Sequence, residues 1–433
     1  MESVFSFFNP FITLLQSEQV KLVFKIIWDT LPLWMPVILF FLFIEVWLRY
    51  LRADFIRKQG SILLEIKVPR EVTRSPLAME IFFTALYQTG AATGVEAWWH
   101  GKIRPWFSLE LVSFEGNIHF FIWTWPKYKN IIEAQLYAQF PGVEIYEVPD
   151  YTGSVTFDPV NLPFWGTYFK LTRPDAYPIK TYVDYGMHED PKEEHKVDPM
   201  TSILEYLGSM RKGEQVWIQI LIQAHKKEGF REGMILPRKD WTDAAKKEIE
   251  KIRTDAAKEY GKAIEAVSPG GQRFGFIALT KGQEEAITAI ERSIGKYSFE
   301  CAIRGFYFAT KESFDPAGIT GLIGSFRQYS SKDLNGFKLG WFSDLSDNQK
   351  DALFWLPVSW LVKLRRSYER KMLKAYKMRS FFNAPYKNFK QGPFILTTEE
   401  VATIFHLPGE VAATPTFARI VSKKGEAPPN LPT

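Results

Sequence analysis

The side chains best suited to binding chemistry form a basic cluster at 359–382, where eight lysines and arginines stand against one acid, Glu369, with aromatic residues interleaved. On a helix, such a cluster can bind nucleic-acid phosphates or anionic lipid headgroups. Arginine suits phosphate because its planar guanidinium donates two hydrogen bonds at once. Alternatively, the helix packs on the body through Leu361, Leu364 and Leu373, or contacts an acidic partner. The candidates for contact with nucleic acid or an acidic partner are Lys363, Arg365, Arg366, Arg370, Lys371, Lys374, Lys377 and Arg379.

Catalytic and metal-binding signals are weak by comparison. His188 and His195 flank acidic residues that could ligate a metal, but carboxylates crowded in a charged loop are usually solvated. Cys301 lies in the apolar run FECAIRGFYFA and is predicted to be a small core residue rather than a nucleophile. A single cysteine also excludes an internal disulfide framework and suits a reducing cytoplasm. We therefore expect no enzyme activity, no catalytic residues, no metal and no cofactor.

The overall composition sets outer limits on the class of protein. The net charge is +5 from 54 basic and 49 acidic residues, so nucleic-acid binding is indicated only by local clusters and not by the whole chain. Aromatic residues make up 16% of the chain, which predicts large packed cores or interfaces. A length of 433 residues leaves room for a membrane segment and two or three domains.

The basic cluster must be positioned by elements that begin with an apolar segment at 31–51, LPLWMPVILFFLFIEVWLRYL. A helix needs roughly 20 mostly apolar residues to cross a bilayer core of about 30 Å. Glu45 is the one ionisable residue between 33 and 48, and it lies near the end of the run, where its cost is smaller. The segment is predicted to be a membrane anchor, and a buried core helix is the alternative. The anchor residues are Leu33, Trp34, Val37, Ile38, Leu39, Phe40, Phe41, Leu42, Phe43, Ile44, Trp47 and Leu48.

The charges that flank this segment predict its orientation. Four basic residues and one acid follow it at 49–58, whereas the charges before it are balanced. The positive-inside rule therefore places the C-terminal side in the cytoplasm, so we expect a single-pass protein with the bulk of the chain cytoplasmic. A cleaved signal peptide is not expected, because a basic start and a small-residue cleavage site are missing. The stretch at 10–28 reads as an amphipathic helix, either in the membrane interface or packed on protein.

Downstream of the anchor, apolar alternation and turn signals predict an α+β fold with two ferredoxin-like (βαββαβ) units and a helical C-terminal section. For the first unit we predict strands at 62–68, 108–114, 118–125 and 143–148, with helices at 76–90 and 126–140. For the second unit we predict strands at 164–171, 214–223, 273–280 and 299–309, with helices at 199–210 and 283–296. The predicted domains are the amphipathic helix with the anchor (1–58), the first ferredoxin-like unit (59–160), the second (161–345, with a helical insert at 226–272) and a basic helical section with a proline-rich tail (346–433).

Three further patterns mark the second half of the chain. A charged helix at 241–266 has a thin apolar seam, which suits either a protruding arm that binds a partner or a solvated helix lying on the body. Asp315-Pro316 starts a helix whose glycines every three residues favour tight packing. The run FILTTEEVATIFHLPG at 394–409 places threonines before Glu399 and Glu400, which is typical of a capped helix start. The later APPNLP is an extended linker.

Several of these runs resemble a known family. They are SPLAMEIFFTALYQTG, AQLYAQFPGVEIYEVPDY, PIKTYVDYG, KVDPM followed by GEQVWIQILIQ, and FILTTEEVATIFHLPG followed by APPNLP. From the anchor onward, the chain resembles the membrane-proximal N-terminal region of type IV secretion or conjugation coupling-type ATPases, as seen in bacteria of the candidate phyla. In that family a P-loop motor follows the linker. This sequence departs from the family there, because it contains no G-x-x-x-x-G-K-[ST] motif to cradle phosphates.

The resemblance implies an accessory role rather than a motor. We expect a non-enzymatic subunit of the bacterial cytoplasmic membrane that tethers or assembles a DNA-translocating or type IV secretion ATPase. The implied partners are the lipid bilayer, a P-loop ATPase in trans and further copies of this chain. The alternative is a membrane-tethered nucleic-acid-binding module that contacts DNA through the basic helix at 359–382.

Overall fold

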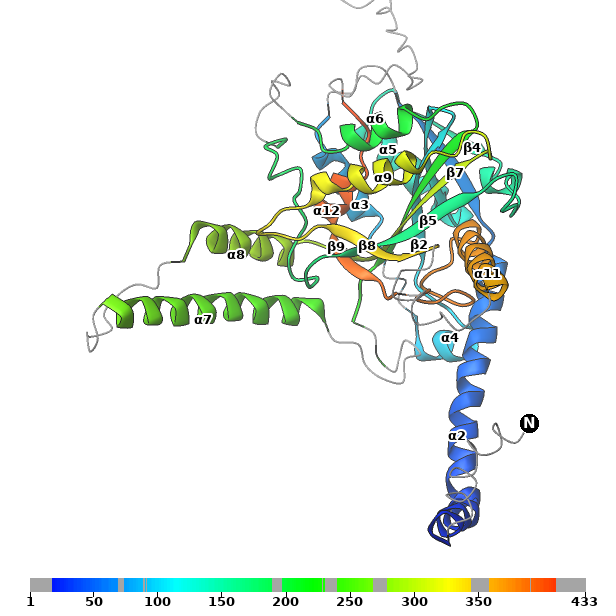
Figure 1. Cartoon of the computed structure of the whole chain (residues 1–433). Coiled ribbons are helices and arrows are strands. Elements are labelled where there is room, and N and C mark those ends of the chain that lie inside the picture. Colours follow the sequence, from blue (N-terminus) through cyan, green and yellow to red (C-terminus); the bar gives the residue numbers. More distant parts are fainter. Residues whose placement is uncertain are drawn as a thin grey trace, which may run out of the picture.

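A computed structural model of the protein (Figure 1) describes residues 18–68, 74–88, 90, 92–188, 197–227, 229, 240–267, 279–343, 358–389 and 391–409. The fold is mixed α+β, with a long apolar N-terminal helix and an antiparallel sheet, as predicted at this level. Nine strands of the described residues form one sheet, in the order β4-β1-β3-β2-β6-β7-β5-β8, and β9 pairs with β7 off this path.

The first half of the sheet is built from residues 62–148. Its strands are β1 (Ile62–Lys67), β2 (Trp106–Phe114), β3 (Asn117–Thr124) and β4 (Glu144–Val148). The helices α3 (Leu77–Ala85) and α5 (Lys129–Gln139) lie between strands in the chain, so the order is βαββαβ as predicted. The turn between β2 and β3 places Glu115 and Gly116 at positive φ, which explains why glycine stands there.

The second half differs from the prediction in the roles of its strands. Its elements are β5 (Phe164–Leu171), α6 (Thr201–Gly208), β6 (Glu214–Ala224), β7 (Ser298–Ala309), α9 (Pro316–Ser325) and β8 (Phe337–Phe342). We expected 299–309 to close the unit, but β7 lies between β6 and β5, and β8 takes the outer position beside β5. Most of the strand predicted at 273–280 falls outside the described residues.

The two halves join where β2 pairs with β6, from Trp106 opposite Gln223 to Phe114 opposite Gln215. Both strands occupy the same place in their half, so the strand order reads outward identically in both directions from this seam. The pairing across the seam is as continuous as the pairing within each half, and it joins the two predicted domains in a single sheet.

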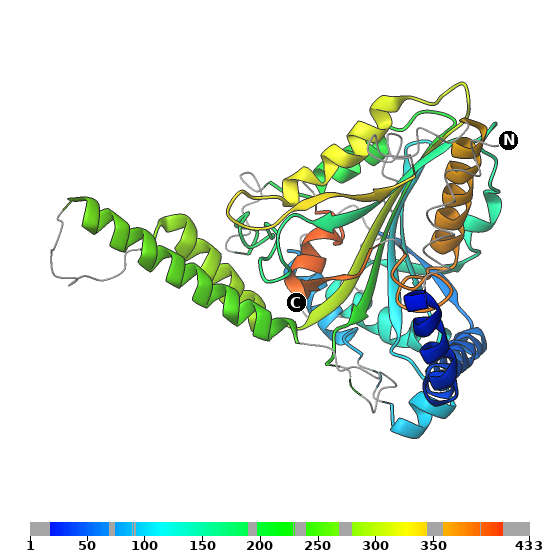
Figure 2. The same ribbon diagram turned by 60° about the horizontal axis from the view of Figure 1, so that its bottom comes forward.

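Each face of the sheet packs against its own helices (Figure 2). Alternation along the strands sends residues such as Ile122 and Ile220 to one face and Trp123 and Leu221 to the other. On the first face lie α3, α5, α6, α9 and α12 (Thr398–Ile404). The opposite face is covered by α11 (Val358–Lys377), the segment that follows it and the end of α2 (Glu18–Gln59).

Two elements project from this body. The helix α2 extends downward in Figure 1, and an arm formed by α7 (Trp241–Val267) and α8 (Lys281–Ile294) extends sideways. The base of the arm packs through Trp241, Ala245, Ile249 and Ile290. The predicted helix at 241–266 is therefore confirmed, while α8, predicted at 283–296 as a helix of the second unit, packs with α7 in the arm.

The remaining predicted helix starts are also found. Asp315 caps α9 by accepting a hydrogen bond from the Ala317 backbone N–H at 2.8 Å. Thr397 and Glu400 form the expected capping box at the start of α12. The short helix α4 (Gly94–Trp99) begins with a second capping box, between Thr93 and Glu96.

Candidate functional site

The basic helix α11 presents most of its charge to solvent. Lys363, Arg365, Arg366, Arg370, Lys371 and Lys374 are exposed, and Lys377 is half-buried. On the opposite side of the helix, Met372, Leu373 and Tyr376 are buried against the sheet. One face of α11 thus packs on the body, and the other presents basic side chains to solvent, where a ligand can reach them. The two alternatives predicted from the sequence, packing and binding, therefore apply to different faces of the same helix.

The prediction that Arg379 contacts nucleic acid or an acidic partner is wrong, because its side chain is buried within the protein. Its side chain is 1% exposed, and its Nε donates to Glu110 Oε1 at 2.9 Å while its Nη2 donates to Glu110 Oε2 at 3.0 Å. Its Nη1 also forms an ion pair with Asp150. Burial alone would lower the pKa of Arg379, but the charge and hydrogen bonds of Glu110, together with Tyr151 and Asp150, outweigh it and hold the pKa well above its usual value. Arg379 therefore attaches the end of α11 to the sheet.

Glu110 is the centre of this buried cluster. Besides Arg379, its carboxylate accepts hydrogen bonds from Ser108 Oγ at 2.6 Å, Gln219 Nε2 at 2.8 Å and the Tyr151 hydroxyl at 2.8 Å. Five donated hydrogen bonds satisfy an ionised carboxylate, so Glu110 is built to hold α11 and the 150–151 segment in place. Such a group is poorly suited to act as a general base, because its lone pairs are occupied.

The cluster straddles the seam between the two halves. Glu110 on β2 lies opposite Gln219 on β6, and Gln219 lies opposite Arg304 on β7. Arg304 is fully buried, donates to the Ser380 carbonyl at 2.6 Å and lies over the Tyr168 ring, with its guanidinium carbon 5.2 Å from the centroid. Burial lowers the pKa of Arg304. The polar residues of both halves thus meet beneath the end of α11.

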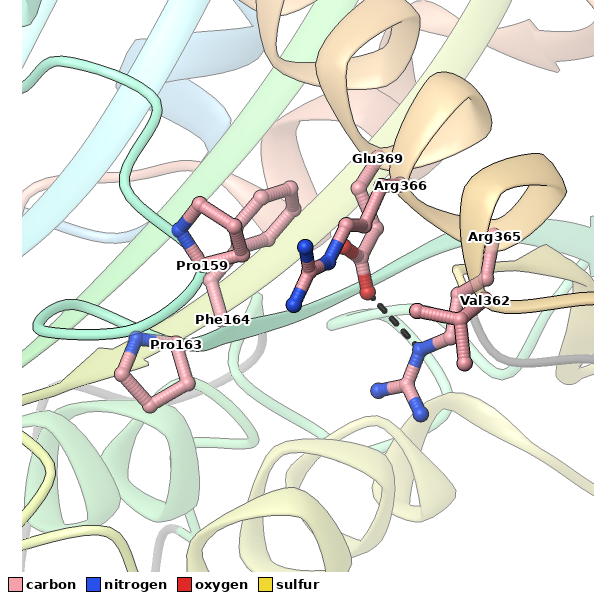
Figure 3. Close-up of a pocket in the computed structure, with 7 residues that line it drawn as sticks. All are labelled: Pro159, Pro163, Phe164, Val362, Arg365, Arg366 and Glu369. Atoms are coloured by element: carbon pink, nitrogen blue, oxygen red, sulfur yellow. Dashed lines mark hydrogen bonds and ion pairs between the residues drawn. The ribbon is translucent and has the colours of Figure 1, made fainter. Parts of the chain in front are cut away.

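A cleft of about 230 Å³ lies beside the other end of α11 (Figure 3). It is lined by Pro159, Pro163, Phe164, Val362, Arg365, Arg366 and Glu369. Arg365 Nε donates to Glu369 Oε1 at 2.9 Å, whereas the Arg366 guanidinium points into the space between the helix and the proline segment. This arrangement offers one cation beside apolar walls, which suits contact with an anionic group on a larger partner.

A second buried charge cluster fixes the C-terminal segment to the body. Lys296 Nζ lies 2.7 Å from Glu80 Oε1 and 2.8 Å from Glu399 Oε2, and Arg292 lies 3.1 Å from Glu399 Oε1. These groups come from α3, α12 and the end of α8, so the capped start of α12 serves packing. Glu400, next to this cluster, has its pKa raised to about 7 by burial.

The structure gives no support to the weak metal-binding and nucleophile candidates of the sequence among the residues it describes. Among the described residues there is no group of three or more histidine, cysteine, aspartate or glutamate side chains that could hold a metal ion. His195 and the acids beside it at 189–194 lie outside the described residues. Cys301 is fully buried, and burial raises the pKa of its thiol well above the usual value, which suits the predicted core role.

The predicted anchor residues lie along α2. Among the described residues, one helix is long and apolar enough to cross a membrane, and it covers Gln19–Gln59. The predicted anchor residues in it are exposed, apart from Ile44, which is partly covered, and Leu48, which is buried. Pro32 and Pro36 lie inside the helix, and in both views the part before them turns away from the rest. The predicted amphipathic helix at 10–28 is, for residues 18–28, the first part of α2.

The sheet, the arm, α11 and α12 together coincide with a known family model, which matches residues 58–419. The chain belongs to DUF8128, a family defined by a domain of unknown function. The DUF8128 region begins at the end of α2, so the apolar part of α2 precedes it. The curated proteins contain no match to this chain.

Glu110, Asp150, Tyr151 and Arg304 were missed as site residues by sequence reasoning. A signal did exist for two of them: Glu110 and Arg304 are lone charges in otherwise apolar strand segments, SLELVSF and AIRGFYFA. A charge in a strand buried on both faces needs a partner, and the basic cluster supplies one for Glu110 in Arg379. Which of eight cations would be that partner could not be chosen from sequence spacing.

Proposed function

We propose that this protein is a single-pass, non-enzymatic accessory subunit that tethers or assembles a DNA-translocating or type IV secretion ATPase at the bacterial cytoplasmic membrane. The observation that carries the membrane part of this proposal is the course of α2. The helix runs without interruption from the apolar segment into the body, where Phe55 and Ile56 pack against the core beneath α11. The choice of partner rests on the sequence resemblance.

The dimensions of α2 support a role in holding the body at the membrane. A helix of 42 residues is roughly 60 Å long, about twice the thickness of a bilayer core. Glu45 is paired with Arg49 at 2.5 Å within the helix, which reduces the cost of placing this carboxylate near the membrane boundary. Phe55 lies edge-on to Trp125, with ring centroids 6.0 Å apart, so the end of α2 is fixed and cannot act as a free tether.

The α7–α8 arm is the surface we assign to a protein partner or a second copy of the chain. It extends transverse to α2 in both views, which would place it parallel to the membrane plane (Figures 1 and 2). Its base is held by apolar packing, and farther out Arg253 and Glu291 join the two helices at 3.3 Å. An arm in this plane can reach a neighbouring subunit at the same height above the membrane.

We assign each half of the sheet to a ferredoxin-like unit. The order β4-β1-β3-β2 and the order β8-β5-β7-β6 both follow the split βαβ arrangement, and all pairings are antiparallel. In this assignment, the arm is an insertion between the two central strands of the second unit. Superposition of β1–β4 on β5–β8 tests this assignment, because a repeat would be excluded if α3 and α5 crossed the sheet differently from α6 and α9.

Co-purification tests the proposed function. Tagged protein is extracted in detergent from membranes of the native host, and the bound proteins are identified by mass spectrometry. We expect a P-loop ATPase at near-stoichiometric level, and we expect it to be lost when 257–277 is replaced by a short Gly-Ser linker that shortens the arm. The matched control changes exposed residues of α5, Ile131 and Tyr137, to serine. Recovery of the chain without any ATPase would overturn the tethering proposal.

A second function, DNA binding through α11, is favoured by its exposed basic side chains. Retention on DNA should fall steeply between about 50 and 200 mM salt if phosphates are the ligand. The variant to compare changes Lys363, Arg366, Lys371 and Lys374 to alanine, which leaves the structural Arg379 in place. The matched control removes four exposed lysines of the arm, Lys246, Lys247, Lys251 and Lys258. Equal retention by both variants would exclude α11 as the DNA-binding element.

A further inference from the structure

A short helix of the body lies against the point where α2 leaves its apolar segment. Gly101, just after α4, has φ +63°, and a Cβ added to it would lie 2.5 Å from the Leu51 carbonyl carbon and 2.7 Å from the Arg52 backbone nitrogen. The backbone after α4 is therefore in direct contact with the backbone of α2. A larger residue cannot occupy this position without separating the two helices.

The position of this contact along α2 can be compared with the bilayer. Leu51 lies three residues beyond Leu48, the last of the predicted anchor residues, which is about 4.5 Å along a helix. The headgroup layer on each side of the hydrocarbon core is roughly 5–8 Å thick. If α2 spans the membrane as proposed above, α4 lies at the level of the lipid headgroups. Among the labelled helices and strands of the body, α4 reaches farthest down beside α2 in Figure 1.

The surface of α4 suits this location. Val95 and Trp99 are four residues apart, so they share one face of the helix, and they are 63% and 66% exposed. On the other side, Ala97 is buried. Tryptophan is enriched at the membrane interface because its ring has an apolar body and a polar N–H. Trp47 and Tyr50 of α2 are also exposed, and both lie within four residues of Leu51, where Gly101 contacts the helix.

Local hydrogen bonds hold α4 rigid enough to present this face. Thr93 N–H donates to Glu96 Oε2 at 2.9 Å, and Lys102 Nζ donates to Glu96 Oε1 at 3.0 Å. The hydrogen bond from the Thr93 backbone, together with the one from Lys102, lowers the pKa of Glu96 to about 2. The carboxylate therefore stays ionised and keeps its bonds to the residue before α4 and to Lys102 after it.

From the Gly101–Leu51 contact and the exposed Val95 and Trp99, we propose that α4 inserts its apolar face into the headgroup layer of the membrane that α2 crosses. The inference rests on the membrane-spanning role of α2 proposed above. It adds a second attachment point, which would fix the rotation and tilt of the body relative to the membrane. Trp99 and Val95 then act as anchors, and Gly101 sets their height.

Site-specific quenching tests the proposal, because the chain has one cysteine and it is buried. The variants Trp99→Cys and Val95→Cys are labelled with an environment-sensitive dye in full-length protein, reconstituted in vesicles that contain nitroxide-labelled phospholipid. Leu39→Cys, in the middle of the apolar segment, is the positive control. Val160→Cys, 55% exposed at the opposite end of the central strands, is the negative control. Unsubstituted protein gives the background labelling.

We expect nitroxide lipid to reduce emission at least twofold at residues 95, 99 and 39 and to leave residue 160 unchanged. Quenching at 39 without quenching at 95 and 99 would overturn the insertion of α4 while leaving the membrane span intact. Absence of quenching at all four positions would overturn both the span and this inference.

Discussion

The two halves of the sheet share a strand order and differ in what is added to it. The first half receives α2 and α4 on the side where β2 begins, at Trp106. The second half carries the α7–α8 arm between β6 and β7, and it supplies the residues of β5, β6 and β7 against which α11 packs. Because the shared part is core structure, the additions indicate how the halves differ in role. In the proposed function, the first half faces the membrane and the second half faces partners.

The join between the halves is the feature on which this comparison depends. Four of the nine residue pairs across the seam are apolar on both sides. Glu110 and Gln219 place polar side chains at the middle of the seam, and Arg379 pairs with Glu110 there. The hydrogen bond from Gln219 to Glu110 joins side chains of the two halves across the seam, and Arg379 pairs with the same carboxylate. The ion pair holds the segment after α11 on the seam, because removal of Arg379 would leave the buried charge of Glu110 without its main partner.

Removing Arg379 should have the largest effect on stability. Arg379→Met leaves Glu110 buried without its main partner, which costs about 3–5 kcal/mol of unfolding free energy. Chemical denaturation of detergent-solubilised protein, followed by tryptophan fluorescence, measures it. Lys374→Met, an exposed change on the same helix, should cost less than about 0.5 kcal/mol. Equal losses for both variants would show that the seam does not depend on the ion pair.

A pH dependence should follow from Glu400, in the C-terminal segment that bridges both halves. Its pKa is raised by burial from 4.5 to about 7, so its contribution to stability is complete below about pH 4.5 and is lost as the pH rises through 7. Between pH 5 and 8 the unfolding free energy should fall by up to about 3 kcal/mol through this group. The Glu400→Gln variant retains an acceptor for the Ile179 backbone N–H and should lose that share of the decline. A decline of the same size in both proteins would remove Glu400 as its source.

The close packing of α9 on α6 in the second half predicts a smaller change in stability, and a second glycine of α9 provides the control. A Cβ at Gly321 would lie 2.5 Å from the Tyr206 ring, so Gly321→Ala should destabilise by about 1–3 kcal/mol. Gly324→Ala, on the same helix, meets nothing within 4 Å and should stabilise by up to about 1 kcal/mol through helix propensity. Thermal unfolding of the two variants should therefore shift in opposite directions, and a shared sign would argue against the tight contact between α6 and α9.

Local patterns predicted the elements well because they depend on neighbouring residues. The strands β2 and β3, the Asp315 cap and the capping box at Thr397 were all predicted from short runs. The strand β8 was missed because FKLGWF is short, contains a glycine and has weak alternation. The placement of β7 in the middle of the second half depends on pairings between residues far apart in sequence, which periodicity does not encode.

The candidate site was predicted only in part for the same reason. Seven of the eight cations lie on α11 as predicted, and Arg379 follows the end of the helix. The burial of Arg379 is decided by a glutamate 269 positions earlier in the chain. The contact of Gly101 with α2 likewise joins segments that are distant in sequence. Nothing in the spacing of the tryptophans at 98 and 99 indicates their position along α2.

The orientation of the body tests the proposed membrane role most directly. Val160→Cys is introduced into the full chain in the native host, and intact cells are treated with a thiol reagent that does not cross the membrane. If α2 spans the membrane and the body is cytoplasmic, residue 160 is labelled only after the membrane is opened, and the protein stays in the membrane fraction after alkaline carbonate washing. Labelling in intact cells, or release of the protein by carbonate, would contradict a membrane-spanning α2 with a cytoplasmic body.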